Sequence, residues 1–341
     1  MSGKKMISLV IPCYNSEKTI CDIVLDAISI LNIHMEYSYE IILVNDGSKD
    51  NTWDMIKRCA DEDGHVTGIN LSKNFGQHNA LIAAYKYVNG DIILGADDDG
   101  EHDMKDIFRL INKMESGGYD FVCASYTLQK KESRFRNIGT KINSLMAQIL
   151  IDKPRDYEFT SFYCSKRFII DQVIKCSNPY PYISGLVLQA SRNLGTVELE
   201  PHPRKYGRSN YSLKKLLKLW LNGFTAFSIK PLRIADVMGV FIALFGFIYE
   251  AALIVRKILY PEIILVGYSS IMATLLFVGG ILMLLLGIIG EYIGRIYINI
   301  NHLPQYVVKE EYHIPEKQKL KKCNGEANGD VGGRKKKESG Y

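Results

Sequence analysis

Short apolar runs alternate with segments of helical periodicity along the first 125 residues. The runs end in turn-forming sequences and predict buried β-strands; they are Ile7–Ile11, Ile41–Val44, Ile69–Leu71 and Ile92–Leu94. The segments between them place apolar residues on one helical face and predict helices over 17–31, 51–59 and 79–88. Strands that alternate with helices imply a mostly parallel sheet, covered by helices on both faces and joined by right-handed crossovers. The pattern therefore predicts an α/β domain of the nucleotide-binding type.

The pattern is less regular between residues 121 and 211. It predicts further strands at Phe121–Ser125, Phe159–Tyr163 and Val197–Leu199, and helices over 138–151 and 168–174. Residues 201–211 combine proline, glycine and aromatic residues with basic side chains, so we expect a mobile loop there.

The chain becomes strongly apolar after this loop. Residues 213–227 place leucine and aromatic residues on one helical face and lysines on another, which is typical of a helix in a membrane interface. A core helix of a soluble domain is the alternative interpretation. Residues 234–255 and 263–289 are each long enough to cross a hydrocarbon core of roughly 30 Å at about 1.5 Å per residue. They predict a transmembrane hairpin.

Basic residues set the expected orientation of this hairpin. The end of the hairpin next to the basic C-terminal tail is flanked by Lys230, Arg233 and Arg295. The short connection at the other end carries Arg256 and Lys257. By the positive-inside rule we expect an integral membrane protein with its first domain and both termini on the cytoplasmic side. The predicted divisions are an α/β domain (1–210), an interfacial helix (211–230), the hairpin (231–300) and a basic, disordered tail (301–341).

Composition narrows the classes of protein. A net charge of +5 over 341 residues does not favour a nucleic-acid partner, and 47% hydrophobic residues are enough for a sizeable core. The seven cysteines contain no CxxC pair, which favours a reducing compartment and argues against a zinc site. The N-terminal apolar run ends at Pro12 and is too short for a signal peptide.

Acidic side chains gather where the predicted strand Ile92–Leu94 ends. Asp97, Asp98, Asp99 and Glu101 follow it directly, while Asp46 follows the second strand. Ligands bind at the carboxyl ends of strands in open α/β sheets, and hard oxygen donors of this kind suit Mg²⁺ or Mn²⁺ together with substrate phosphates. An acidic turn in water is the alternative interpretation.

Five segments followed by a membrane hairpin carry a family resemblance. They read VIPCYNSEKTI, ILVNDGSKDNT, NFGQHNALIAAYKYVNGD, ADDDGEHD and RKYGRSNY. Over about residues 6–300 the chain resembles the family-two inverting glycosyltransferases of the GT-A fold. Within that family it is similar to the polyisoprenyl-phosphate glycosyltransferases, such as dolichyl-phosphate mannose synthase and bacterial undecaprenyl-phosphate sugar transferases.

The resemblance implies a role for particular residues. Those that would bind the nucleotide-sugar are Pro12, Tyr14, Glu17, Asp46, Asp97, Asp98 and Ser209. Those that would hold Mg²⁺ or Mn²⁺ are Asp97, Asp99 and Glu101, where glutamate replaces the family's usual glutamine. Arg204 and Arg208 would meet the phosphates and act in catalysis with Asp97 and Asp99. The acceptor phosphate would be held by Arg134, Arg136 and Ser161.

The resemblance implies inverting transfer of a sugar to a polyprenyl phosphate, for modification of cell-envelope glycans. A UDP-linked sugar is the first expectation for the donor, and a guanosine-linked sugar is the second. Such an acceptor is already an anion, so it needs no strong general base. A hydroxyl acceptor in polysaccharide synthesis would need an acid such as Asp98, Asp99 or Glu101 to take its proton. A non-catalytic membrane scaffold is the third alternative. Small residues in the second span would allow homo-oligomers to form; they are Gly279, Gly280, Gly287 and Gly290.

Overall fold

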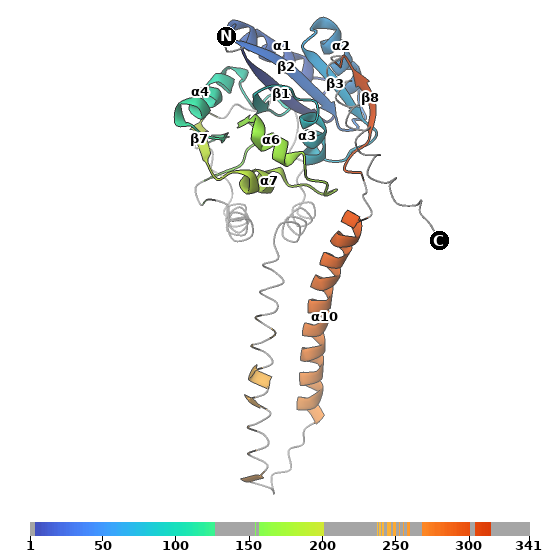
Figure 1. Cartoon of the computed structure of the whole chain (residues 1–341). Coiled ribbons are helices and arrows are strands. Elements are labelled where there is room, and N and C mark those ends of the chain that lie inside the picture. Colours follow the sequence, from blue (N-terminus) through green and yellow to red (C-terminus); the bar gives the residue numbers. More distant parts are fainter. Residues whose placement is uncertain are drawn as a thin grey trace, which may run out of the picture. The chain divides into compact units, whose positions relative to one another are not determined.

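The computed structural model describes residues 4–126, 154, 157–200, 268–300 and 304–314, together with single positions between 237 and 259. The chain divides into two compact units (Figure 1). The first comprises residues 1–137, 156–210 and 304–341, and the second comprises 138–155 and 211–303. Several predictions lie outside the described residues: the helix over 138–151, the loop over 201–211, the interfacial helix over 211–230 and the tail beyond 314.

An eight-stranded sheet forms the centre of the first unit, in the order β7-β5-β6-β4-β1-β2-β3-β8. Its strands are β1 (Lys5–Cys13), β2 (Tyr37–Asn45), β3 (Val66–Leu71), β4 (Ile92–Gly95), β5 (Phe121–Ser125), β6 (Tyr163–Lys166), β7 (Leu194–Glu198) and β8 (Val308–Tyr312). The pairs β1·β2, β1·β4, β2·β3 and β5·β7 are parallel, whereas β6 is antiparallel to β4 and β5. The predicted GT-A-like α/β fold with a mostly parallel sheet is confirmed.

The direction of the strand order reverses beside β1. The chain runs outward from β1 through β2 to β3 and then returns to place β4 on the other side of β1. The carboxyl ends of β1 and β4 are therefore neighbours at a reversal point. Crevices of this kind are where open α/β sheets bind ligands.

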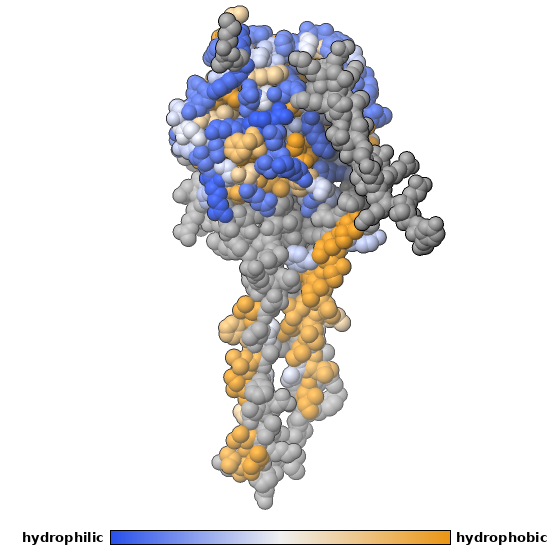
Figure 2. All heavy atoms as spheres, in the orientation of Figure 1, coloured by the Kyte–Doolittle hydropathy of each residue, from blue (hydrophilic) through white to orange (hydrophobic). Residues whose placement is uncertain are grey.

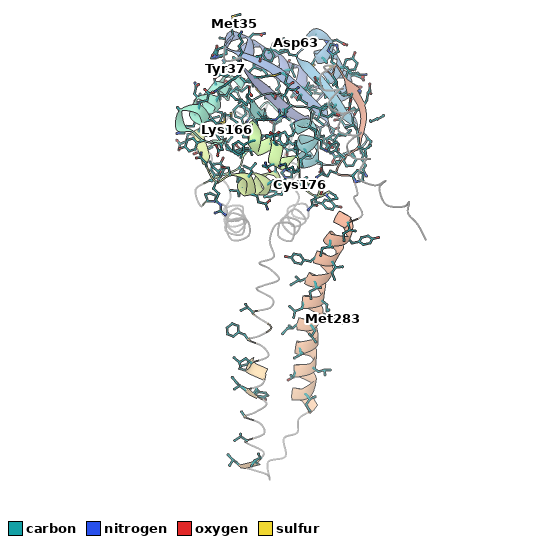
Figure 3. The ribbon with its side chains drawn as sticks, viewed as in Figure 1. Met35, Tyr37, Asp63, Lys166, Cys176 and Met283 are labelled. Carbon is teal, nitrogen blue, oxygen red and sulfur yellow. The ribbon has the colours of Figure 1, made fainter. Side chains whose placement is uncertain are left out.

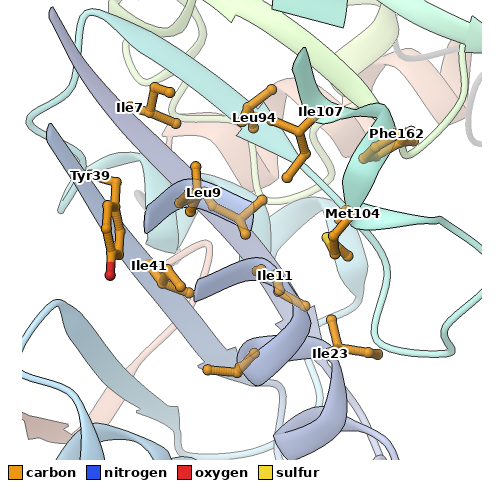
Figure 4. Packing of buried hydrophobic residues seen from close by; sticks show 14 of the residues in the cluster. Ile7, Leu9, Ile11, Ile23, Tyr39, Ile41, Leu94, Met104, Ile107 and Phe162 are labelled. Carbon is orange, nitrogen blue, oxygen red and sulfur yellow. The ribbon is translucent and has the colours of Figure 1, made fainter. Parts of the chain in front are cut away.

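Helices cover both faces of the sheet. One face packs against α1 (Ile20–Ile33), α2 (Thr52–Glu62) and α4 (Ile107–Gly117), with the 3₁₀ turn η1 (Met104–Asp106) before α4. The other packs against α3 (Gln77–Tyr85), α6 (Arg167–Val173) and α7 (Ile183–Ala190). Along β1 the buried side chains alternate between the faces, so that Leu9 and Ile11 belong to the same hydrophobic cluster as Ile23 of α1 (Figure 4), while Val10 belongs to the cluster on the opposite face.

The segment after residue 304 corrects one prediction. Disorder is predicted from residue 301, but β8 pairs antiparallel with β3 and closes that edge of the sheet (Figure 1). The backbone N–H of Ser72 donates to the carbonyl of Val307 at 2.9 Å, and the Trp53 indole donates to Glu310 at 2.9 Å. The residues of β8 are charged and only weakly apolar. The segment forms a strand because the edge of β3 offers unpaired backbone groups.

Two other differences concern residues 105–190. The strand predicted at Phe159–Tyr163 begins instead at Tyr163, and in the preceding segment the hydroxyl of Thr160 donates to the carbonyl of Ala124 at 2.9 Å. Helices α4 and α7 are additional to those predicted. The predicted helix over 168–174 and the strand at 197–199 are present as α6 and β7.

The second unit is described mainly through α10 (Tyr268–Ile300), which has 33 residues and continues beyond the predicted end at residue 289. Its described side chains are largely hydrophobic (Figure 2), and Met283 projects from it with 75% of its surface exposed (Figure 3). Several α10 side chains are outside the described set. When only residues with a described backbone and side chain are counted, no helix is both long and apolar enough to cross a membrane.

Candidate functional site

The candidate site lies at the carboxyl ends of the parallel strands β1, β2 and β4. Three loops begin there, at Tyr14 after β1, at Asp46 after β2 and at Ala96 after β4. The N–H of Asp46 donates to the carbonyl of Cys13 at 2.9 Å, and the N–H of Ala96 donates to that of Val10 at 3.2 Å. The sheet thus fixes the start of the second and third loops against β1.

Asp98 ties the loop after β4 to the loop after β1. Its carboxylate accepts a hydrogen bond from the backbone N–H of Tyr14 at 2.8 Å, and its carbonyl accepts one from the hydroxyl of Thr19 at 2.6 Å. Burial raises the pKa of Asp98 to about 6, although the bond from Tyr14 favours the ionised form. Asp98 therefore connects two of the predicted binding loops.

Both carboxylate oxygens of Asp97 have partners from other parts of the chain. Gln77, at the first position of α3, donates to Oδ1 at 2.8 Å, and the hydroxyl of Ser161 donates to Oδ2. The side chain remains 24% exposed, and Nε2 of His102 lies 3.6 Å from Oδ2. Asp97 is therefore held in a defined orientation and stays accessible to a ligand.

His102 is a buried titratable side chain beside Asp97, with 4% of its side chain exposed. Its Nδ1 lies 2.7 Å from the Tyr126 hydroxyl and its Nε2 lies 3.3 Å from the Ser161 hydroxyl. The imidazole also stacks on Phe162 at 4.8 Å between ring centroids. No role is predicted from the sequence for His102, Tyr126 or Gln77, although His102 lies within the acidic segment.

Asp99 and Glu101 occupy the same turn. The N–H of Glu101 donates to Oδ1 of Asp99 at 3.1 Å, and both side chains are partly exposed. Within the described ranges, no three Asp, Glu, His or Cys side chains are gathered as a group that could hold a metal ion. Mg²⁺ commonly uses one or two carboxylates and completes its coordination with substrate phosphates, so the oxygen donors of Asp97 and Asp99 fit such an ion chemically.

Asp46 anchors the loop that precedes α3. Its carboxylate accepts hydrogen bonds from the backbone N–H groups of Phe75 at 2.7 Å and Gly76 at 2.9 Å. Burial raises the pKa of this carboxyl, while the two N–H donors oppose the shift. Because Gln77 follows directly, Asp46 fixes the loop from which Gln77 reaches Asp97.

The remaining predicted donor-site residues lie at the end of β1. Pro12 is buried within the strand, opposite Val44 of β2, whereas the Tyr14 ring is 44% exposed. Glu17 accepts hydrogen bonds from both the backbone and the side-chain amide of Asn51, at 3.1 and 3.2 Å. Glu17 therefore joins the loop after β1 to the start of α2, and Tyr14 offers an aromatic surface.

Four of the predicted arginines and one predicted serine belong to segments that the structure does not describe. They are Arg134, Arg136, Arg204, Arg208 and Ser209. Of the three residues predicted to hold an acceptor phosphate, only Ser161 is described, and its hydroxyl contacts Asp97.

Comparison with known proteins gives two family matches. Residues 8–176 match the model of Glycosyl transferase family 2, and residues 230–296 match that of the GtrB C-terminal hairpin. The second match covers the predicted membrane hairpin.

Related proteins match over nearly the whole chain. One is the undecaprenyl-phosphate 4-deoxy-4-formamido-L-arabinose transferase of Proteus mirabilis (strain HI4320), 32% identical over 92% of this chain and 96% of its own. Another is the uncharacterized glycosyltransferase YkcC of Bacillus subtilis (strain 168), 32% identical over 93% and 98%. A solved structure, mannosyl-3-phosphoglycerate synthase from Rubrobacter xylanophilus, is 18% identical with a TM-score of 0.45, covering 67% of this chain and 74% of that one.

Proposed function

Because the chain belongs to glycosyl transferase family 2, we propose that it transfers a sugar from a nucleotide-sugar donor to a polyprenyl phosphate, with inversion at the sugar carbon. The acceptor class is supported by the Proteus mirabilis relative, whose name states undecaprenyl phosphate as its acceptor. We propose a UDP-linked donor and a product used in modifying cell-envelope glycans.

The observation that carries this proposal is the set of carboxylates at the reversal point of the sheet. Asp97 and Asp99 follow β4, next to the end of β1, which is where an α/β sheet binds a nucleotide. We propose that Asp97 and Asp99 hold Mg²⁺ or Mn²⁺, with Glu101 as a third ligand. When bound, such an ion offsets the negative charge that develops on a diphosphate leaving group, an effect worth several kcal/mol.

The loops around these carboxylates suit a donor nucleotide. Tyr14 exposes an aromatic ring at the end of β1, and the buried Asp46 shapes the loop after β3 through two backbone bonds. We propose that the base and ribose lie along these two loops. Arg204, Arg208 and Ser209 would add charge-assisted hydrogen bonds to the diphosphate.

The acceptor chemistry needs no strong base in the site. A polyprenyl phosphate is an anionic nucleophile at neutral pH, so the protein has to bring two anions together in line. We propose that Arg134 and Arg136 hold the acceptor phosphate. The described site contains carboxylates, hydroxyls and an imidazole, and the hydroxyl beside that imidazole, Ser161, is already bonded to Asp97.

The proposed acceptor also explains the apolar segments between residues 213 and 289. A polyprenyl chain gains about 0.8 kcal/mol per CH₂ by staying in lipid, so the enzyme has to work at the bilayer surface. The match to the GtrB C-terminal hairpin and the apolar side chains along α10 support a hairpin inserted in the membrane. We propose that the hairpin spans the bilayer and that both termini lie in the cytoplasm.

The test uses membranes that contain the full chain, polyprenyl phosphate, and Mg²⁺ or Mn²⁺. A panel of radiolabelled nucleotide-sugars is offered one at a time, and label is followed into the lipid phase. We expect one donor to label the lipid, a chelator to stop the reaction, and Asp99→Asn to reduce it strongly. Asp54→Asn, which changes an exposed carboxylate paired with Lys57, serves as the matched control. Label in long polymer, or full activity of Asp99→Asn, would overturn the proposal.

A further inference from the structure

We propose that His102 and Ser161 are positioning residues for Asp97, linked to Tyr126 in one chain of hydrogen bonds that fixes the carboxylate for its ligand. The inference rests on the proposed function only in taking that ligand to be the metal ion of the donor diphosphate. It gives Ser161 a different role from the contact to an acceptor phosphate that the family resemblance implies.

For a neutral imidazole, the polar contacts allow one consistent assignment of protons. The Tyr126 hydroxyl lies 2.7 Å from Nδ1 of His102, and Nε2 of His102 lies 3.3 Å from Oγ of Ser161, whose hydroxyl donates to Asp97. A carboxylate can only accept, so Ser161 must donate to it and is left to accept from His102. His102 then carries its proton on Nε2, and Nδ1 accepts from Tyr126. The order of donation is Tyr126 to His102 to Ser161 to Asp97.

The surroundings fix the imidazole at the centre of this chain. It is 4% exposed and stacks on the rings of Phe162 and Tyr126, at 4.8 and 6.0 Å between centroids. Burial and nearby acidic groups raise the pKa of Tyr126, which keeps its hydroxyl protonated as a donor. A flat, buried ring with a partner on each nitrogen has little freedom to turn.

The other oxygen of Asp97 is held from a separate element. Gln77 donates to Oδ1 at 2.8 Å from the start of α3, while Ser161 donates to Oδ2 from the segment before β6. Each carboxylate oxygen can accept more than one bond, so both keep capacity for a cation. The carboxylate plane is thus set before a ligand arrives, and less conformational entropy is lost on binding.

Groups that orient a metal-binding carboxylate typically account for about 10- to 100-fold in metal affinity or activity. Ser161→Ala removes one oxygen and breaks the last link. His102→Phe keeps a flat ring for stacking and removes both nitrogens, whereas His102→Gln restores a side-chain N–H donor. His34→Phe is the matched control, since His34 also stacks on a phenylalanine, Phe108, at 3.4 Å but lies outside the candidate site.

The experiment measures Mn²⁺ binding to the full chain in detergent with UDP present, by electron paramagnetic resonance, alongside the thermal midpoint of each variant. We expect Ser161→Ala and His102→Phe to raise the Mn²⁺ dissociation constant about 10- to 100-fold, with His102→Gln intermediate and His34→Phe unchanged. Equal Mn²⁺ affinity in wild type and Ser161→Ala would overturn the inference, and Ser161→Ala provides this test even where His102→Phe fails to fold. A lowered thermal midpoint with unchanged Mn²⁺ affinity would also overturn it, by showing a purely structural role. Failure of lipid labelling with an intact Mn²⁺ effect would reject the proposed acceptor and leave the positioning role standing.

Discussion

The carboxylate of Asp98 accepts a hydrogen bond from the backbone N–H of Tyr14 at 2.8 Å and thereby joins the loop after β4 to the end of β1. The cost of this connection is the burial of an acid, which raises the pKa of Asp98 to about 6.

Asp98 should make the protein less stable as the pH rises. Its folded-state pKa of about 6 lies above the ordinary value of 3.8, so the folded protein holds this proton more tightly than the unfolded chain. The stabilisation is complete below about pH 4 and is lost as the pH rises through about 6, a change on the order of 2 to 3 kcal/mol. Asp98→Asn keeps an acceptor for Tyr14 and cannot ionise. The thermal midpoint of Asp98→Asn minus that of wild type should therefore be larger at pH 7.5 than at pH 4.5.

Thermal unfolding of the full chain in detergent at the two pH values measures this difference. Asp54→Asn, at an exposed carboxylate, should show no such rise relative to wild type. Parallel midpoints for Asp98→Asn and wild type would contradict the assignment.

Replacing Asp46 should lower stability and weaken donor binding through the loop that Asp46 anchors. Asp46→Ala leaves the N–H groups of Phe75 and Gly76 without their acceptor, and each unsatisfied buried group costs about 1 to 3 kcal/mol. Asp46→Asn keeps one acceptor oxygen and should lose about half as much stability. We expect both variants to raise the donor KM because Gln77 follows this loop. Denaturant unfolding and initial rates test the order, and equal losses in the two variants would exclude the two-bond explanation.

Gly47 should be far less replaceable than Gly118, although both have a left-handed backbone with φ of 63° and 66°. A Cβ on Gly47 would lie 2.3 Å from the carbonyl carbon of Lys73, whereas a Cβ on Gly118 meets nothing within 4 Å. Gly118→Ala should cost about 1 to 2 kcal/mol from backbone strain alone. Gly47→Ala should cost at least about 1 kcal/mol more, since backbone has to move. Unfolding of the two variants side by side gives the comparison, and similar losses would contradict it.

The parts of the fold that are predictable from sequence are those with a local signal. Strand β1 and strand β2 are apolar runs closed by turn residues, and the acidic segment directly follows a third such run in β4. Helix α4 also carries a local signal, because Ile107, Leu110, Ile111 and Met114 follow helical spacing and are buried. That helix could have been predicted from the printed sequence.

The features that escape prediction depend on contacts between distant segments. Tyr126, His102 and Ser161 meet only because β4, β5 and β6 are neighbours, and the sequence gives no sign of the bond between Ser161 and Asp97. The burial of Asp98 likewise depends on the loop after β1. Strand β8 reads as a charged segment, and its pairing depends on the exposed edge of β3.

Removing β8 should destabilise the first unit. Its segment contributes the bond from the Trp53 indole to Glu310 at 2.9 Å and the bond from Tyr312 to Asp61 at 2.8 Å. Gln305, just before the strand, adds a bond to the carbonyl of Asn178, in the segment that follows α6, at 2.7 Å. Loss of these bonds and of the backbone pairing also exposes the edge of β3 to other chains.

We therefore expect a chain that ends at Leu303 to lose at least about 3 kcal/mol of unfolding free energy, at roughly 1 kcal/mol for each net hydrogen bond. We also expect it to aggregate on heating. A chain that ends at Ile314 keeps every described contact of this segment and should unfold like the full chain. Glu310→Ala alone should cost about 1 kcal/mol, because it removes the acceptor of the Trp53 indole and leaves the backbone pairing in place. Thermal unfolding in detergent, followed by tryptophan fluorescence and light scattering, compares the three with wild type. An unchanged midpoint for the chain that ends at Leu303 would show that β8 adds nothing to stability, because this variant removes the whole strand and not one side chain.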